Sequence, residues 1–234
     1  MSDKKIALVT GGNRGIGLQV VRELLQTGFE VVLTCRNPDQ GRAATEQWGS
    51  LLNGLHFLEL DVSDSGLVEN CAKTFAEQFG RLDVLVNNAG ILLDASESIL
   101  SVSEEVIEKT INTNSVGPLR VAKAFLPFLK KSEDARVINV SSLAGQLKDM
   151  GSWAPAYSIS KTTLNAVTCL LSNELSPEGI KVNAVSPGWI RTEMGGDAAP
   201  GTLEEGADTI MWLATEASPE ITGQFLRERE STDW

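Results

Sequence analysis

The only tyrosine of the chain stands four residues before a lysine, in the segment Tyr157-Ser-Ile-Ser-Lys161. This spacing puts both side chains on one face of a helix. A nearby ammonium group favours the phenolate, so we expect Lys161 to lower the pKa of Tyr157 from its ordinary value of about 10. We therefore predict that Tyr157 serves as a general acid, although an amphipathic helix can also carry such a pair without any catalytic role.

A second segment rich in glycine, Thr10-Gly-Gly-Asn-Arg-Gly-Ile-Gly17, follows a strand-like run and opens an expected helix. Gly11 can turn the chain, Gly15 lets the backbone approach a pyrophosphate, and Gly17 permits close packing of the helix on the strand. A phosphate loop of the NTPase type would need Lys-Ser or Lys-Thr where Leu18-Gln19 stands. The glycine spacing alone also fits a structural turn. We predict a bound dinucleotide, with contacts from Gly11, Asn13, Arg14, Gly15, Ile16 and Gly17.

The expected second strand ends in Thr34-Cys35-Arg36, at the point where an NAD-binding protein places a carboxylate on the ribose. The guanidinium groups of Arg36 and Arg14 offer charge-assisted hydrogen bonds to a 2′-phosphate. We therefore predict NADPH or NADP+ as the cofactor, unless both arginines are solvated surface charges. Polar turns follow two further strands, where adenine and ribose would lie, and we expect contacts there from Asp61, Val62, Asn88, Ala89 and Gly90.

Short β-branched runs alternate with longer helical stretches, which is typical of repeated βαβ units. The expected strands are Ile6–Val9, Val31–Thr34, Leu55–Leu60, Val84–Val86, Val137–Val140, Val182–Val185 and a weaker Gln224–Leu226. The expected helices cover about residues 15–27, 39–52, 65–79, 103–130, 157–174 and 203–215, with Asp64 and Ser103 as N-caps. Continuous apolar strands indicate a parallel sheet covered on both faces. We predict one α/β domain over residues 1–234, a Rossmann-type doubly wound sheet of about seven strands, with the Gly195–Gly201 loop as a surface lid.

Composition excludes several other classes of protein. Twenty basic against 31 acidic residues give a formal net charge of −11, which argues against nucleic acid as a partner. No run approaches the ~20 apolar residues that cross a bilayer, and no signal peptide opens the chain, so we predict a cytoplasmic protein without a membrane partner.

The sequence contains few of the residues that metal sites and histidine-based catalysis require. His56 is the only histidine, and the alternation of Leu55-His-Phe-Leu-Glu-Leu60 predicts a position in the core or at a strand edge. A zinc site or a Ser-His-Asp triad is therefore disfavoured, and we predict no metal. Cys35, Cys71 and Cys169 are expected as reduced thiols.

At this point the motifs together resemble the short-chain dehydrogenase/reductase family over nearly the whole chain. The resemblance rests on the glycine turn, Asn87-Asn-Ala-Gly90, Asn114-Ser-Val-Gly117, Ser141-Ser142, Tyr157-x-x-x-Lys161 and Pro187-Gly188, which occur in the family's order. Four further segments resemble its carbonyl reductase branch, namely Val31–Arg36, Gly188–Met194, Leu203–Ala207 and Gly223–Phe225.

The resemblance implies roles for individual residues. Ser142, which stands three residues before Gly145 as the family's serine does, would hold the carbonyl oxygen in preference to Ser141. Tyr157 would protonate that oxygen, while Lys161 would bind the nicotinamide ribose and bias Tyr157. Asn114 would position a water that extends the proton relay. The nicotinamide carboxamide would be lined by Pro187, Gly188, Ile190 and Thr192.

The sequence also gives expectations about the substrate and the oligomeric state. Mostly apolar residues flank the reacting centre in sequence and favour a hydrophobic ketone or aldehyde, namely Leu143, Ala144, Leu147, Trp153, Trp189 and Met194. Arg191 is either a site for an acidic substrate or a solvated charge. The chain lacks the insertion between Ser142 and Tyr157 that the monomeric vertebrate carbonyl reductases carry. We therefore expect a homodimer or homotetramer, through apolar helix faces at Val121, Ala122, Phe125, Leu164, Val167 and Leu171.

Three functions share these features. The leading prediction is an NADPH-dependent reductase of a ketone or aldehyde. A 3-oxoacyl-(acyl-carrier-protein) reductase would use the same chemistry but needs a basic docking patch, for which Lys130-Lys131 is the candidate. A non-catalytic NADP(H)-sensing regulator is the third, although such relatives usually lose the tyrosine or the lysine, and both are present here.

Overall fold

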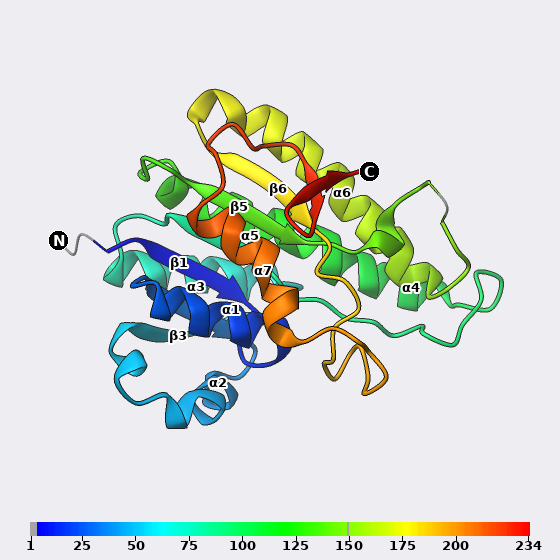
Figure 1. The fold of residues 1–234 in the computed structure, drawn as a ribbon, viewed down its shortest axis with the longest axis horizontal. Coiled ribbons are helices and arrows are strands. Elements are labelled where there is room, and N and C mark those ends of the chain that lie inside the picture. Colours follow the sequence, from blue (N-terminus) through cyan, green and yellow to red (C-terminus); the bar gives the residue numbers. More distant parts are fainter. Residues whose placement is uncertain (1–3, 149) are drawn as a thin grey trace.

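The computed structural model describes residues 4–148 and 150–234, which form one eight-stranded sheet in the order β3-β2-β1-β4-β5-β6-β7-β8 (Figure 1). The strands β1 to β7 are parallel, and β8 pairs antiparallel with β7. Their bounds are β1 Ile6–Thr10, β2 Glu30–Cys35, β3 Leu55–Glu59, β4 Val84–Asn87, β5 Arg136–Val140, β6 Lys181–Val185, β7 Phe225–Arg227 and β8 Glu230–Thr232.

Helices cover both faces of this sheet. They are α1 Gly15–Gln26, α2 Pro38–Thr45, α3 Ser65–Gln78, α4 Glu104–Ile111, α5 Gly117–Leu129, α6 Pro155–Leu175 and α7 Leu203–Thr215. Successive strand residues point to opposite faces, so β1 sends Ala7 and Val9 toward α1 and α7, and Leu8 toward α3 and α5. Two hydrophobic cores result, one on each face, and the predicted doubly wound architecture is confirmed (Figure 1).

Each expected strand is present, and the eighth strand was missed. The sequence Glu230-Ser-Thr232 is short, polar and largely exposed, so it carries no strand pattern. The expected helix over 39–52 ends at Thr45 and continues as 3-10 turns from Glu46 to Gly54, which are kinked at Gly49, where φ is 57°. The helix over 103–130 is split by a π-helical turn at Asn112–Val116, within which Asn114 is fully buried.

The expected helix caps and the placement of His56 are confirmed. Asp64 accepts from the Leu67 N–H at 3.0 Å, and Ser103 accepts from the Val106 N–H at 3.3 Å. His56 lies on the edge strand β3, with its Nε2 at 2.8 Å from a carboxylate oxygen of Glu30 on β2. The three cysteines are free thiols, and burial raises the pKa of Cys71 to about 12.

The apolar faces expected for subunit contact are mostly core instead. Val121, Ala122, Phe125 and Leu164 are buried within the chain itself, and the Phe125 ring packs against Phe75 at 5.3 Å between centroids. Leu171 packs partly buried against the same core, and Val167 is half-buried. These helix positions repeat toward the sheet, so the apolar pattern reports intrachain packing. None of the helices in residues 4–148 and 150–234 is both long and apolar enough to cross a bilayer.

Candidate active site

The predicted site residues converge at the edge of the sheet where the parallel strands end. The glycine turn follows β1, Asn88 follows β4, Ser142 follows β5 and Pro187 follows β6. In a doubly wound sheet, ligands bind outside the carboxyl ends of the strands, where the strand order reverses. Here the order reverses between β1 and β4, which brings the first two of these segments together.

Lys161 lies beneath this edge as a buried cation. Its side chain extends from α6 to the end of β5, where Nζ donates to the Val140 carbonyl at 2.8 Å. The residue is 4% exposed, and this burial lowers the pKa of Lys161 to about 8. Its Nζ lies 5.5 Å from the centre of the Tyr157 ring. The predicted pair is therefore in contact, with the ammonium against the face of the phenol ring.

Tyr157 behaves differently from the expectation. Burial raises the pKa of its phenol to about 12, and a hydrogen bond with Ser142 acts in the opposite direction without outweighing burial. The expected lowering by Lys161 is therefore wrong for this structure, because desolvation of the phenolate dominates. A raised pKa keeps the proton on Tyr157 at neutral pH, which is the state that a general acid requires.

The two neighbouring serines after β5 face different partners. Ser142 opens a 3-10 turn at Leu143–Gly145, where its Oγ accepts from the Ala144 N–H at 3.2 Å and faces Tyr157. Ser141 is buried, and its hydroxyl donates to Asn165 Oδ1 at 2.6 Å. Ser142 is therefore the serine with access to a ligand above Tyr157.

Asn114 has its side chain fully engaged. Its Oδ1 accepts from the Ile91 N–H at 2.8 Å, and its Nδ2 donates to the Ile91 carbonyl at 2.8 Å and to Ser160 Oγ at 3.0 Å. A methyl group added at Gly90 would lie 3.4 Å from Asn114 Oδ1 and 3.7 Å from Lys161 Nζ. Asn114 and Lys161 thus flank the backbone of Gly90, while the water relay stays a prediction.

The glycine turn is held by the segment after β4. Asn88 Nδ2 donates to the carbonyls of Thr10 at 2.9 Å and Gly11 at 3.1 Å. A Cβ at Gly17 would come within 2.4 Å of Asn88 Nδ2, so glycine is required there by the asparagine. Ala89 lies against Gly11 in the same way, at 3.1 Å from a Cβ built there.

The N-terminus of α1 is left open by these contacts. Its N-cap residue, Arg14, makes no capping bond, and the first turn contains no acidic residue. By contrast α2, α3, α4 and α7 are capped by side chains of Asn37, Asp64, Ser103 and Thr202. Free N–H groups and the positive end of a helix dipole bind phosphate, so the first turn of α1 fits a dinucleotide pyrophosphate.

The two arginines predicted to select the cofactor lie at this turn. Arg14 is exposed and pairs with Glu193 of the loop after β6, a contact that the sequence did not indicate. Arg36 is exposed beyond the end of β2, and within residues 4–148 and 150–234 its guanidinium makes no hydrogen bond or ion pair. Asn13 is tied to α2 through Gln40 at 3.3 Å. Both guanidinium groups therefore lie where solvent or a ligand can reach them.

The two residues after β3 that were expected to contact adenine or ribose, Asp61 and Val62, have different surroundings. Asp61 Oδ1 accepts from the backbone and the hydroxyl of Ser63 at 2.9 and 2.6 Å, which fixes the turn after β3. Val62 is buried, and a Cβ at Gly117 would come within 2.9 Å of its side chain. Its side chain is therefore a packing contact, and its carbonyl accepts from Arg120, so Val62 offers a ligand little beyond its N–H.

The loop after β6 is firmly braced within itself. Trp189 Nε1 donates to the Gly195 carbonyl at 2.8 Å, Arg191 Nε donates to Ala199 at 3.2 Å, and Thr192 Oγ1 accepts from Gly195 at 3.0 Å. Gly188, next to the half-buried Pro187, takes a φ of 85°. The side chain of Ile190 is buried beneath α7. Of the residues predicted to line the nicotinamide, Thr192 lies against the glycine turn, at 3.4 Å from a Cβ built at Gly15.

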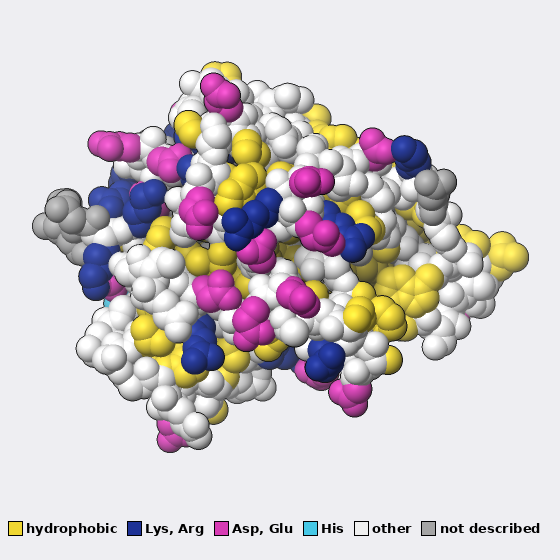
Figure 2. Space-filling model, in the orientation of Figure 1, with side chains coloured by type: hydrophobic (Ala, Val, Ile, Leu, Met, Phe, Trp, Pro, Cys, Tyr) yellow, Lys and Arg dark blue, Asp and Glu magenta, His cyan; other side chains and the backbone are white. Residues whose placement is uncertain are grey.

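Large apolar side chains are exposed in the loops that follow the carboxyl ends of β4, β5 and β6. Of the ten exposed large hydrophobic residues among those described, eight lie in the loops after β4, β5 and β6: Leu93, Ile99, Leu100, Leu147, Met150, Trp153, Trp189 and Met194. The Trp153 ring lies 5.9 Å from the Tyr157 ring, whereas Leu143 and Ala144 are half-buried. Figure 2 shows hydrophobic side chains gathered on the right of the view, the side where α4 lies in Figure 1. Leu93 was not among the predicted apolar residues of the substrate site, although the apolar run Ile91-Leu-Leu93 comes just after the polar turn that ends β4.

Comparisons with known proteins agree with this geometry. The family model described as short chain dehydrogenase matches residues 5–202. The chain is 34% identical to (+)-neomenthol dehydrogenase of Arabidopsis thaliana, over 98% of both chains. It is 30% identical to a 3-oxoacyl-[acyl-carrier-protein] reductase of Chlamydia pneumoniae, over 95% of this chain and 94% of the relative.

Among solved structures, NADPH-bound carbonyl reductase from chicken fatty liver superposes with a TM-score of 0.91. It is 32% identical, and the match covers 99% of both chains. The region matched by the family model, residues 5–202, includes each strand from β1 to β6, the glycine turn and the Tyr157-x-x-x-Lys161 segment. The chain belongs to the short-chain dehydrogenase/reductase family of oxidoreductases, within which it is similar to the carbonyl reductases.

Proposed function

We propose that this protein reduces a ketone or aldehyde to an alcohol, with NADPH as the hydride donor. The observation that carries the proposal is the contact among Ser142, Tyr157 and Lys161 at the carboxyl end of β5. Reduction develops negative charge on the carbonyl oxygen, and two hydroxyl donors above a buried cation stabilise that charge.

Each of the three residues has one task in this mechanism. Ser142 donates a hydrogen bond that orients the carbonyl oxygen over Tyr157. Tyr157 transfers its phenolic proton to that oxygen, and its raised pKa ensures that the proton is present at neutral pH. Lys161 holds positive charge beneath the ring and offsets the phenolate that remains. The nicotinamide cofactor supplies the hydride when it is bound.

The cofactor assignment is supported by the open first turn of α1 and by Arg36. The N–H groups of the first turn of α1 have no side-chain cap and can meet a pyrophosphate, and no carboxylate replaces Arg36 at the end of β2 to repel a 2′-phosphate. Arg14 would contribute once its side chain leaves Glu193. The chicken carbonyl reductase, which binds NADPH, supports the same choice.

The substrate that best fits is a hydrophobic carbonyl compound. The Trp153 ring lies 5.9 Å from Tyr157, and exposed apolar side chains of Leu147, Trp189 and Met194 stand in the same loops after β5 and β6. The Arg191 Nε donates to the Ala199 carbonyl of the same loop, so this side chain has a structural role, and this argues against Arg191 as the binding site of an acidic substrate.

Reduction of a carrier-bound 3-oxoacyl chain is the second candidate, since one relative carries that name. Its docking patch would need to lie near the site, but Lys130 and Lys131 follow α5 and precede β5, at the opposite edge of the sheet. Lys130 is also paired with Glu178 at 2.5 Å. These placements favour a free carbonyl substrate. The intact Tyr157 and Lys161 favour turnover over the regulatory alternative.

The test is an initial-rate assay with a panel of ketones, aldehydes and 3-oxoacyl thioesters, with NADPH beside NADH. We expect NADPH turnover on apolar carbonyl compounds, and we expect Tyr157→Phe to lower kcat by roughly 10²–10⁴-fold without weakening NADPH binding, because only the acid is removed. Activity that survives in Tyr157→Phe would refute the assigned acid. Tight NADPH binding without turnover on any member of the panel would favour the regulatory alternative.

Assembly and location remain predictions. A homodimer or homotetramer would have to use surfaces other than the buried positions named above, such as the exposed Leu170 on α6. Sedimentation that shows only monomer would contradict it. A cytoplasmic location is consistent with the free cysteines, and cell fractionation tests it.

A further inference from the structure

The helix that carries Tyr157 has no cap of its own. The N-cap residue of α6, Ala154, takes a left-handed conformation with a φ of 45° and offers no side-chain acceptor. Pro155 has no N–H, so Ala156 provides the first donor of the helix. That donor is used by a residue 62 positions earlier in the chain, because Asp94 Oδ2 accepts from the Ala156 N–H at 2.5 Å.

Asp94 is an unusual cap because it is buried. It is 1% exposed, and its second oxygen, Oδ1, has no hydrogen-bond partner in the described part of the chain. Burying a carboxyl group with an unpaired oxygen costs free energy, whereas an exposed local cap such as Asp64 gains the same bond without that cost. Stability alone therefore does not account for a long-range cap at this helix.

The contacts around Asp94 converge on the backbone of Tyr157. Asn114 bonds both the N–H and the carbonyl of Ile91, which fixes the start of the segment that carries Asp94. The same Asn114 donates to Ser160 Oγ, and Ser160 donates to the Tyr157 carbonyl at 2.7 Å. The first turn of α6 is thus held on one side by Asp94 and on the other by Ser160.

We propose that Asp94 is a positioning residue, which fixes the first turn of α6 so that the Tyr157 phenol meets the substrate oxygen beside Ser142. The proposal rests on the reductase function proposed above. Without the cap the first turn can fray, because its leading N–H group loses its acceptor. A misplacement of ~1 Å at a reacting group can lower the rate on the order of 10²-fold.

Three variants test this role. Asp94→Ala removes the acceptor, Asp94→Asn retains an amide oxygen that can accept from Ala156, and Asp64→Ala removes a matched cap from α3. At saturating NADPH we expect Asp94→Ala to lower kcat by ten- to a hundredfold with the NADPH Kd within about threefold. Asp94→Asn should recover kcat to within about threefold of the parent. Asp64→Ala should lose thermal stability while kcat stays within about twofold.

The single tyrosine provides a readout that does not depend on turnover. In protein labelled with ¹³C at the tyrosine ring, Tyr157 gives one signal, which Tyr157→Phe identifies. We expect Asp94→Ala to shift or broaden that signal, and Asp94→Asn and Asp64→Ala to leave it as in the parent. Should Asp94→Ala not fold, Asp94→Ser, whose shorter hydroxyl leaves Ala156 unpaired, replaces it.

The outcomes are separable from those of the function itself. A parent protein without turnover would refute the proposed function, and the tyrosine signal would still decide whether Asp94 positions Tyr157. An Asp94→Ala protein with unchanged kcat and an unchanged signal would overturn the positioning role. A loss of kcat in Asp64→Ala equal to that in Asp94→Ala would overturn it as well, since a general loss of stability would then explain both.

Discussion

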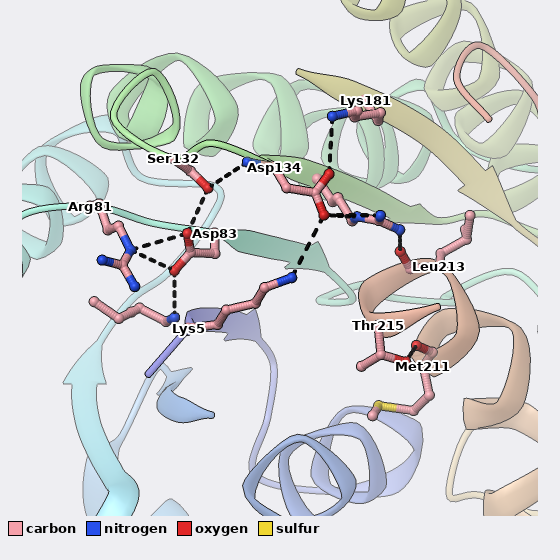
Figure 3. A network of polar contacts seen from close by, with 11 residues as sticks. Lys5, Arg81, Asp83, Ser132, Asp134, Lys181, Met211, Leu213 and Thr215 are labelled. Atoms are coloured by element: carbon pink, nitrogen blue, oxygen red, sulfur yellow. Dashed lines mark hydrogen bonds and ion pairs between the residues drawn. The ribbon is translucent and has the colours of Figure 1, made fainter. Parts of the chain in front are cut away.

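Charged groups are paired at one end of the parallel strands and mostly unpaired at the other. We call the side where the strands begin the amino edge and the side where they end the carboxyl edge. At the amino edge, Asp83 accepts from Arg81 and from Ser132, and Asp134 accepts from Arg136 and Lys181 at 3.0 Å each (Figure 3). Arg136 also donates to the Leu213 carbonyl in α7 at 2.6 Å. At the carboxyl edge, Lys161 is bonded to a carbonyl alone, Arg36 has no partner within the described ranges, and the first turn of α1 has no cap.

This difference separates stability from function within one sheet. Charges that are paired and hydrogen-bonded stabilise the fold, so the amino edge links β4, β5, β6 and α7. The Arg36 guanidinium and the N–H groups of the first turn of α1, which we propose to meet the cofactor, have no side-chain partner in the described residues, and such groups add no stability until a ligand binds. Replacing the buried Lys161 should therefore raise stability, whereas replacing a paired charge of the amino edge should lower it.

The largest effect is expected at Lys161. Lys161→Met keeps the size of the side chain but removes a buried charge whose pKa has fallen from 10.5 to about 8. At pH 7 we expect reductase activity to be lost and the free energy of unfolding to rise by up to about 3 kcal/mol, the equivalent of that pKa change. Urea unfolding measures the stability, and the initial-rate assay measures the activity.

The pH dependence of this gain has a definite sign. In the parent, the folded state releases the Lys161 proton near pH 8 and the unfolded state near 10.5, so the parent gains stability between these values. The advantage of Lys161→Met should therefore be full below pH 8 and shrink toward zero near pH 10.5. Lys181→Met, the matched change at the amino edge, should be less stable than the parent at pH 7. A stabilised Lys181→Met would contradict the contrast between the edges.

A smaller effect is expected at Arg36, and it concerns binding. Arg36→Ala should weaken NADPH binding by roughly ten- to a hundredfold, which corresponds to one lost charge-assisted bond of about 1.5–3 kcal/mol, and should leave NADH binding nearly unchanged. Fluorescence titration with both nucleotides checks this. The free energy of unfolding should not change, because Arg36 has no partner in the described residues. An equal loss for both nucleotides would remove the 2′-phosphate assignment.

The smallest effect is expected at Asp134. Burial alone would raise the pKa of this carboxyl, but hydrogen bonds from Lys181 and Arg136 outweigh it and lower the pKa below 3.8. Asp134→Asn should lose about 1 kcal/mol of stability at pH 7, since the group is partly exposed, and should keep its kcat. The difference should persist above pH 3.8 and vanish as the pH falls through the lowered value. Unfolding curves over a series of pH values from 7 downward measure it, and a reduced kcat would show that the edges are coupled.

Much of the architecture could be predicted because its signals are local. The strands β1 to β7 were found from apolar runs, and Asp64 and Ser103 were found as caps from residue type and position. The missed elements have weak local signals. Strand β8 is formed by polar residues that pair with β7 where the chain reverses, and the π-turn at Asn112–Val116 buries Asn114, whose side chain bonds to the distant Ile91 and Ser160.

The helical apolar pattern was the least decisive signal. It identified α5 and α6, but it could not say whether Phe125 and Leu164 face another subunit or the sheet, because both alternatives require the same residues. The same limit applies to Asp94, which carries no motif and gains its importance from the distant N–H of Ala156.

The sequence by itself determined the family and the order of the strands along the chain, and it singled out Ser142, Tyr157 and Lys161 as candidates, because each of these depends on local pattern and spacing. Only the tertiary structure decided the state of these groups. Burial sets the pKa of Tyr157 and Lys161 in directions that their spacing does not indicate, and contacts between distant segments decide which helix ends are capped and which remain open. Spacing fixes which groups can meet, whereas desolvation and long-range hydrogen bonds depend on everything that packs around them.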